Sequence, residues 1–241
     1  MCTVTVIPKG NNDFVLTSNR DEAPNRISLP PDIYDDHGLK LLFPKDIQSG
    51  GTWIGASEKN RLVCLLNGGF RIHKRKEKYR KSRGVVAIDF MIAEYILSVI
   101  NDYDFIDIEP FTAVIIDWNS ALKFYELVWD GQEKHVTQLP LEPKLWSSST
   151  LYSESMKNER EKWFEDFKSQ NKFNSNALLH FHKTAGNKNN DYGVVMNRGF
   201  VKTTSITQVV KQNGIIEMRY ENLRNKLVST EIFNIHEKIN E

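Results

Sequence analysis

The stretch Leu62-Val63-Cys64-Leu65-Leu66 is apolar at every position, and it decides the fold class of this chain. A strand with one wet face alternates apolar and polar residues, whereas a continuous apolar run is typical of a strand covered on both faces. Residues 52–57 precede it across the turn residues Glu58-Lys59-Asn60, so we expect a strand pair here. This pair should lie inside a layered domain, with a sheet or helices on each side.

Further strands and helices are predicted on both sides of this pair. Residues 2–8 with 14–18, 111–118 with 122–129, and 205–211 with 215–220 predict hairpins, and a third strand is expected after Asp130-Gly131. Residues 85–100 place apolar side chains on one helical face, and 154–167 and 174–183 also predict helices. Residues 19–31 are polar and contain proline, which indicates a loop. Antiparallel hairpins with intervening helices indicate an α+β domain of packed layers.

Length and charge narrow the class of protein. The 241 residues can bury one sizeable core, and we take residues 1–241 as a single domain. The formal net charge is only +1, so the chain has no overall field that would attract nucleic acid. No apolar run reaches the roughly 20 residues that span a bilayer, and the N-terminal segment lacks a secretory signal. We therefore expect a cytoplasmic protein without nucleic-acid partners and without integral membrane association.

Cys2 directly follows Met1, and this position gives it a chemistry that an internal cysteine lacks. Methionine aminopeptidase acts when the second residue is small, and removal of Met1 would leave a thiol and a free α-amine on one residue. An α-amine has a pKa of about 8 and can take the proton of its own side chain. Cys2 is therefore the candidate catalytic nucleophile. The plain alternative is a small residue at a terminus, and the second cysteine, Cys64, is expected to be a free thiol.

Polar segments beside the predicted strands could complete a site around Cys2. In Ser18-Asn19-Arg20-Asp21-Glu22, the Asp21 carboxylate could orient the α-amine, and an arginine could lower a thiol pKa or bind an anion. In Asn67-Gly68-Gly69, the Asn67 amide and a backbone N–H could stabilise an oxyanion. Taken alone, each segment is also an ordinary turn. Gly50-Gly51-Thr52-Trp53-Ile54-Gly55 is either a flexible entry to a strand or a backbone wall with Trp53 on a pocket rim.

Taken together, these segments resemble the NRDE family, also called transport and Golgi organisation protein 2-like. The resemblance covers about the first 70 residues and rests on Met1-Cys2-Thr3, Thr17-Ser18-Asn19-Arg20-Asp21-Glu22, Gly50-Gly51-Thr52-Trp53-Ile54-Gly55 and Leu66-Asn67-Gly68-Gly69. The chain also resembles, more remotely, the N-terminal-nucleophile hydrolases of the choloylglycine hydrolase and penicillin V acylase group. This resemblance implies an αββα sandwich, four layers built around two antiparallel sheets, with Cys2 as the nucleophile.

The resemblance also implies roles for individual residues. Asp21 matches the acylase aspartate in its spacing from Cys2, whereas the acylase arginine falls on Ser18 here and Arg20 is the adjacent substitute. A later acylase asparagine of the oxyanion hole falls on the run 147–149, where Ser148 or Ser149 stands in. Lys202 is the nearest cation to the position of a C-terminal arginine. The implied catalytic residues are Cys2, Asp21, Asn67 and Arg20, and the implied substrate-binding residues are Asn19, Trp53, Gly68, Ser148 and Ser149.

Several other signals carry less weight. The six histidines form no pair at helical ligand spacing and there is no CxxC, so we expect no metal; without a GxGxxG or Walker loop we expect no cofactor. The basic stretch from Arg71 to Arg83 is interpreted as a solvated loop, with a lid over the pocket or a nucleic-acid contact as alternatives.

The leading hypothesis is an N-terminal-nucleophile cysteine amidohydrolase that acts on a small non-peptide amide. The alternative is a non-catalytic protein of the same fold that binds or traffics a small hydrophobic ligand such as haem or lipid. The expected partner is a small-molecule substrate or ligand, and a homo-oligomer is compatible with the resemblance, since related acylases often form homotetramers.

Overall fold

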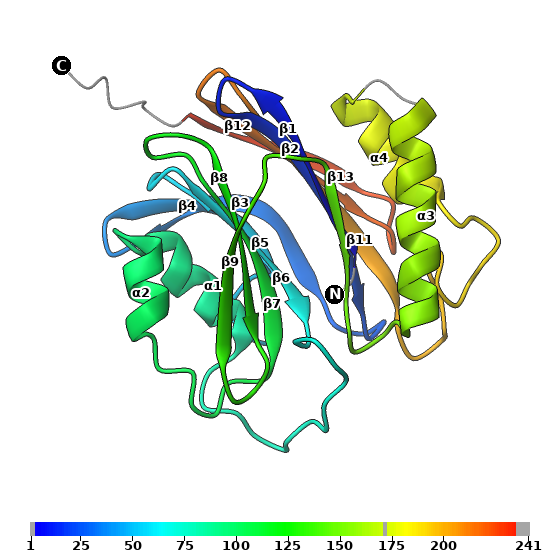
Figure 1. Ribbon diagram of the computed structural model, residues 1–241, viewed down its shortest axis with the longest axis horizontal. Coiled ribbons are helices and arrows are strands. Elements are labelled where there is room, and N and C mark those ends of the chain that lie inside the picture. Colours follow the sequence, from blue (N-terminus) through cyan, green and yellow to red (C-terminus); the bar gives the residue numbers. More distant parts are fainter. Residues whose placement is uncertain (1–2, 171–172, 235–241) are drawn as a thin grey trace.

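Two antiparallel β-sheets face each other at the centre of the molecule (Figure 1). The computed structural model describes residues 3–170 and 173–234. The first sheet has the order β10-β1-β2-β11-β12-β13, with the bounds Lys144–Ser147, Thr3–Gly10, Asp13–Glu22, Lys202–Gln212, Ile215–Asn222 and Val228–Asn234. The second has the order β3-β4-β5-β6-β7-β8-β9, with the bounds Ser28–Asp36, Leu39–Asp46, Ile54–Ser57, Arg61–Asn67, Phe111–Asp117, Lys123–Trp129 and Lys134–Leu139.

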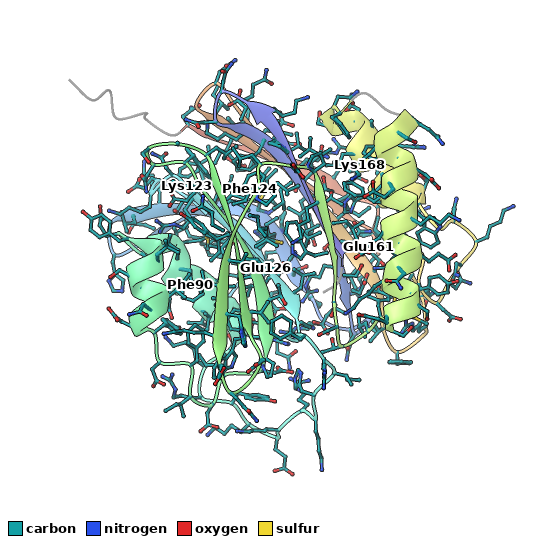
Figure 2. The ribbon with its side chains drawn as sticks, viewed as in Figure 1. Phe90, Lys123, Phe124, Glu126, Glu161 and Lys168 are labelled. Carbon is teal, nitrogen blue, oxygen red and sulfur yellow. The ribbon has the colours of Figure 1, made fainter. Side chains whose placement is uncertain are left out.

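Helices cover the outer face of each sheet. The helices α1 (Arg83–Ile92) and α2 (Ile96–Asp102) pack on the second sheet, and α3 (Glu154–Gln170) and α4 (Ser175–Thr184) pack on the first. Figure 2 shows Phe90 on the side of α1 and α2, while Glu161 and Lys168 lie on α3 at the opposite side of the molecule. The predicted α+β sandwich with the layer order αββα is therefore confirmed. None of the helices in the described part of the chain has the length and apolar character to cross a membrane.

Three apolar clusters fill the spaces between the four layers. The cluster between the sheets contains Val4 and Leu16 of the first sheet and Phe124 of the second. A second cluster joins the outer face of the second sheet to α1 and α2, and a third joins the first sheet to α3 and α4. Burying one large apolar side chain contributes about 1.5–3 kcal/mol, so these three clusters supply most of the free energy that holds the layers together.

The apolar run at 62–66 lies in β6 and is buried at every position, as predicted. Leu62, Cys64 and Leu66 point into the cluster between the sheets, whereas Val63 and Leu65 point into the cluster beneath α1. Alternate residues of a strand face opposite sides, so a strand between another sheet and a helix needs apolar side chains on both. The run therefore indicated the sandwich correctly.

The helix predicted over 85–100 is divided into α1 and α2. Helix α1 ends at Ile92, and Ala93 has an extended conformation with φ −57° and ψ 132°. The carbonyls near its end accept hydrogen bonds from the second sheet: Ser57 Oγ donates to Met91 O at 2.7 Å, and the Arg61 guanidinium donates to Phe90 O and Ala93 O. These bonds satisfy the carbonyls that a helix end leaves without partners, and the chain turns before α2.

The loop predicted over 19–31 is wrong at both ends. Strand β2 continues to Glu22, and β3 begins at Ser28. Strands β3 and β4 pair with each other, and β10 and β13 form the edges of the first sheet, although none of these four strands was predicted. The polar residues at the end of β2 stay in the sheet because β11 pairs with β2 as far as Glu22, while β1 pairs with it on the other side as far as Asn19.

Candidate functional site

A cavity of about 310 Å³ opens between the two sheets at the end where β2 and β6 terminate. Its walls come from Arg20 and Glu22 of β2, from Asp46 at the end of β4, from Thr52 and Trp53 before β5, and from Asn67 at the end of β6. Arg26, Ser49 and Glu109 also contribute, and the rest of the wall comes from the segment 75–84, which belongs to the cyan loop at the bottom of Figure 1 and to the start of α1. The basic stretch thus borders the cavity, the position considered above for a lid.

Arg20 lies at the centre of a buried charge cluster on this cavity. Only 1% of Arg20 is exposed, and its guanidinium pairs with Asp46 and lies over the ring of Trp53, with Cζ 4.6 Å from the ring centroid. Arg26 Nε donates to the same Asp46 carboxylate at 2.7 Å, and Arg26 also pairs with Glu22 at 3.2 Å. Because two arginines alternate with two carboxylates, each buried charge has an opposite neighbour.

The pKa values in this cluster follow from its burial and its pairing. Burial alone would raise the pKa of Asp46, but hydrogen bonds from Arg26 and the Ser49 backbone, with the charges of Arg26 and Arg20, hold it below its ordinary 3.8. Burial lowers the pKa of Arg20 from its ordinary value, and the Glu22 and Asp46 carboxylates partly offset that effect. Both groups are therefore charged at neutral pH.

The opposite face of β2 carries a neutral hydrogen-bond network. His182 of α4 is fully buried, with Nδ1 2.6 Å from Asn19 Oδ1 and Nε2 2.7 Å from Thr5 Oγ1. Asn19 Nδ2 donates to the carbonyls of His182 and Val194 at 3.0 and 2.5 Å, which leaves Oδ1 to accept from Nδ1–H. Burial, together with the charge of Arg160, lowers the pKa of His182 to about 3, so this imidazole is neutral at physiological pH.

Arg160 of α3 connects this face to the start of β1. Its side chain is fully buried and donates to Thr3 Oγ1 at 2.6 Å and to the carbonyls of Tyr192 and Gly193 at 2.8 Å each. Its Cζ also lies 3.5 Å from the centroid of the Tyr152 ring. Arg160 therefore joins the first described strand residue, a turn near residue 193 and Tyr152 in one arrangement.

Tyr152 and Thr203 hold the carboxylate of Asp21. Tyr152 Oη donates to Asp21 Oδ2 at 2.5 Å, and Thr203 Oγ1 donates to Asp21 Oδ1 at 2.6 Å. Burial, reinforced by the charge of Asp21, raises the pKa of Tyr152 well above 10, so the phenol keeps its proton and remains a donor. Both oxygens of Asp21 are thereby fixed in direction.

The ends of β6 and β10 meet beside the cavity. Ser148 Oγ donates to the carbonyl of Asn67 at 2.8 Å, which ties the second sheet to the segment after β10. Gly68 has φ +84°, and a Cβ at this position would lie 2.3 Å from Ser149 Oγ. Only glycine fits here, because the backbone is left-handed and a side chain would collide with Ser149. Asn67, Gly68, Ser148 and Ser149, although 80 residues apart in sequence, thus form one junction.

A pair of glycines lets helix α1 approach the cavity wall. A Cβ on Gly51 would lie 2.4 Å from the carbonyl carbon of Gly84, and one on Gly84 would lie 2.9 Å from Thr52 O. The backbones of these segments are also joined by Thr52 N–H, which donates to Gly84 O at 3.3 Å. The run at 50–55 therefore serves close packing of the α1 N-terminus, and Trp53 lines the cavity as the pocket-rim interpretation predicts.

Several buried polar atoms near the cavity have no hydrogen-bond partner among the described residues. They are Arg20 Nε, Trp53 Nε1, Asn67 Oδ1 and Ser149 Oγ. Buried polar groups in proteins are nearly always paired, and exceptions are commonly explained by function or by an unseen ligand or water. Three of the four residues, Arg20, Trp53 and Asn67, line the cavity itself.

The predicted site residues are thus divided by strand β2. Arg20, Trp53 and Asn67 lie on the cavity, with Gly68, Ser148 and Ser149 at its β6 end, whereas Asn19 and Asp21 bond to groups from the helical side and from β11. Cys2 lies outside the described residues. Cys64 is fully buried, and burial raises the pKa of its thiol to about 12, which makes it unreactive in the folded protein.

Four residues that organise this site were not predicted as site residues: Asp46, Tyr152, Arg160 and His182. Their side-chain hydrogen-bond partners named above lie 20 to 177 residues away along the chain. Arg160 is one of several charged residues in α3, and within the helix only its alignment with the buried Phe164 and Phe167 distinguishes it. His182 shares a helix face with the buried Leu178, the one available signal of its burial.

Solved structures with similar folds come from a group of amide-cleaving enzymes. The conjugated bile acid hydrolase of Clostridium perfringens, solved as its C2A mutant, has a TM-score of 0.56 and 12% identity over 97% of this chain and 93% of its own. The penicillin V acylase of Agrobacterium tumefaciens has a TM-score of 0.57 and 10% identity, covering 95% of this chain and 85% of its own. The N-acylethanolamine-hydrolyzing acid amidase orthologue of Caenorhabditis elegans has a TM-score of 0.53 and 11% identity, covering 87% of this chain and 92% of its own. The chain therefore has the fold of the N-terminal-nucleophile hydrolases.

Sequence comparison identifies the family. The Transport and Golgi organization 2 homolog of Mus musculus is 29% identical over 90 residues, which are 36% of this chain and 32% of that protein. The match thus spans about a third of the length of this curated relative. The model of the family Transport and Golgi organisation 2 matches residues 1–183, about three quarters of the sequence. The chain belongs to the Transport and Golgi organisation 2 family.

Proposed function

We propose that the chain is an N-terminal-nucleophile amidohydrolase that uses Cys2 to cleave a small non-peptide amide. The observation that carries the proposal is the gathering of Arg20, Trp53 and Asn67 on one cavity. Thr3, to which Cys2 is bonded, pairs with Asn19, the neighbour of Arg20 in β2. The nucleophile assigned from sequence and the residues expected to assist it therefore belong to adjoining segments.

The proposed reaction begins at the Cys2 thiol. The α-amine exposed by loss of Met1 takes the thiol proton, and the sulfur attacks the amide carbonyl carbon. The Asn67 amide and a backbone N–H stabilise the oxyanion, and the α-ammonium returns its proton to the departing amine. The resulting thioester is attacked by water, whose proton passes to the α-amine. The products are a carboxylic acid and an amine, and the enzyme is regenerated.

The networks on the helical side of β2 support this chemistry by fixing positions. Arg160 holds Thr3 Oγ1, one residue from the proposed nucleophile, and Tyr152 and Thr203 fix the Asp21 carboxylate. Orientation of reacting groups is worth several kcal/mol in enzymes. In this proposal Asp21 orients the α-amine, and Arg160 is a positioning residue that acts through Thr3.

Mass spectrometry of the intact protein tests the first requirement. We expect a mass without Met1, and rapid addition of one iodoacetamide to Cys2, while the buried Cys64 stays unmodified until the protein unfolds. Hydrolysis of a panel of simple acyl amides should disappear in Cys2→Ala and fall about 100- to 1,000-fold in Asn67→Ala, the usual loss for one oxyanion donor. A retained Met1, or full activity in Cys2→Ala, would refute the proposal.

The lining of this cavity does not support the alternative function, the binding of a hydrophobic ligand such as haem or lipid. Trp53 and Tyr79 are its aromatic residues, and ten of its seventeen lining residues are charged. A large apolar ligand would leave those charges desolvated. The lining favours a polar molecule.

A further inference from the structure

The cavity has a local excess of positive charge that the chain as a whole lacks. The acidic residues in its lining are Glu22, Asp46, Glu77 and Glu109, and the basic ones are Arg20, Arg26, Arg75, Lys78, Lys81 and Arg83. The lining thus carries two more cations than anions, and one more once the pairing of Lys81 with Asp89 outside the lining is counted, whereas the formal net charge of the whole chain is +1. An enclosed excess of this kind concentrates oppositely charged ligands.

The first turn of α1 adds to this positive potential. Ser82, Arg83 and Gly84 line the cavity, Ser82 caps the helix by accepting a hydrogen bond from Val85 N–H, and the first turn contains no acidic residue. A helix N-terminus carries N–H groups without intrahelical partners and a partial positive charge, and both favour anions. The glycine contact between Gly51 and Gly84 keeps this turn against the cavity wall.

Two buried donors on the same cavity have nothing to bond within the described residues. Arg20 is 1% exposed and Trp53 is 2% exposed, yet Arg20 Nε and Trp53 Nε1 have no acceptor there. Both groups are N–H donors, so the partner that would satisfy them is an acceptor. These donors are independent of the helix terminus, and an acceptor atom in the cavity, from a ligand or a water, would satisfy them.

We propose that this cavity binds a carboxylate carried by the substrate, so that the preferred substrates are small acidic amides. This proposal depends on the proposed amidohydrolase function in one respect only: it calls the bound ligand a substrate. A volume of about 310 Å³ suits a compact polar molecule. Arg75 and Lys78 of the bordering segment supply the accessible part of the charge: Arg75 is 74% exposed at its side chain, and Lys78 is exposed as well.

The experiment measures binding without turnover. Cys2→Ala protein of full length is titrated by calorimetry with N-acetylglycine and succinamic acid, which carry the carboxylate on the amine and acyl sides, and with their neutral counterparts N-acetylglycinamide and succinamide. We expect each acid to bind at least about tenfold more tightly than its neutral counterpart at low salt, and the difference to shrink at high salt. Inorganic phosphate is the competitor; if it binds more tightly than either acid, the site is a phosphate site and the proposal is overturned.

Matched variants locate the effect. Arg75→Gln/Lys78→Gln removes two charges from the lining, and Arg71→Gln/Lys74→Gln removes two charges from the same exposed segment outside the lining. The first pair should weaken acid binding about tenfold and the second less than twofold. Equal effects of the two pairs, or equal binding of acids and neutral amides, would overturn the proposal. Hydrolysis of neutral amides by the parent protein would in that case still uphold the amidohydrolase function, whereas tight acid binding without hydrolysis would remove the function and keep the site.

Discussion

The two faces of strand β2 differ in how completely their buried polar groups are hydrogen-bonded. On the cavity face, Arg20 belongs to a cluster of charges whose hydrogen-bonding capacity is not all used. On the helical face, Asn19 is part of a neutral network with His182 and Thr5 in which the Asn19 amide and both ring nitrogens of His182 have hydrogen-bond partners. A saturated network can hold a backbone in place but offers nothing to a ligand. In the function proposed above, the helical face positions the site and the cavity face meets the substrate.

The largest effect is expected from Arg160→Met, which removes the connection between α3 and β1. The change leaves Thr3 Oγ1 and the carbonyls of Tyr192 and Gly193 without their donor, and it should lower the free energy of unfolding by roughly 3–5 kcal/mol. Lys162→Met, an exposed change in the same helix, is the control. Urea denaturation measures both, and a loss under 1 kcal/mol in Arg160→Met would show that the helical face does not position β1.

His182→Gln should change how stability depends on pH. The pKa of His182 is lowered to about 3 in the folded protein, from 6.5. The stability that the neutral imidazole provides is therefore complete above pH 6.5 and is lost as the pH falls towards 3, at about 1.4 kcal/mol per pH unit. Glutamine cannot be protonated in this range, so the variant should lose less stability between pH 6.5 and 4. The exposed His180→Gln is the control, and identical slopes in all three proteins would contradict the network.

Asp46→Asn tests the cavity face and should have a smaller effect. Arg20 and Arg26 lose their shared carboxylate but keep Glu22, so we expect a loss of about 1–3 kcal/mol. Because the pKa of Asp46 is held below 3.8, its contribution is complete above that pH and disappears as the pH falls through the lower folded-state value. Denaturation curves between pH 2 and 6 should converge for the variant and the parent at the acid end. If the difference in unfolding free energy between the variant and the parent stays constant over this pH range, the loss comes from packing and not from the charge of Asp46.

The smallest effect is expected at the junction beside the cavity, where two adjacent serines differ. Ser149 Oγ has no partner among the described residues, so Ser149→Ala should change the unfolding free energy by less than about 0.5 kcal/mol. Ser148→Ala takes away the donor to Asn67 O and should cost about 1 kcal/mol. If Ser149→Ala nonetheless raises KM for the preferred amide, that serine belongs to the substrate-binding face.

The part of the fold that could be predicted from the sequence depended on the pattern of apolar residues. The run at 62–66 determined the sandwich because each side of β6 is filled by its own cluster. The pattern at 85–100 predicted a helix, but α1 fully buries Val86, Ala87, Phe90 and Met91, which the face predicted through Val85, Ile88 and Ile92 did not include. The pattern also did not contain the break at Ala93, which depends on Ser57 of β5 and Arg61 of β6. The end of β2 was missed because its polar residues are satisfied by partners distant in sequence.

The predictable part of the site came from segments that the family shares. Arg20, Trp53 and Asn67 were chosen from short motifs, and all three line the same cavity. Nothing in the local sequence identified the site residues Asp46, Tyr152, Arg160 and His182. A buried arginine in a charged helix, for example, has the same local sequence as an exposed one. The roles of Arg160 and His182 arise only when α3 and α4 pack on the first sheet, whereas Asp46 meets Arg20 where the end of β4 approaches β2. In both cases the topology of the fold determines the neighbours.

The central position of β2 also has a consequence during synthesis on the ribosome. Its partner β11 begins at Lys202, roughly 180 residues after β2 ends at Glu22, which corresponds to about 9–36 s at usual translation rates. Throughout that interval β2 has β1 on one side and an open edge on the other. Open strand edges invite aggregation, and charged residues along them discourage it. Arg20, Asp21 and Glu22 place three charges on this edge, and two of them, Arg20 and Glu22, line the cavity in the finished protein.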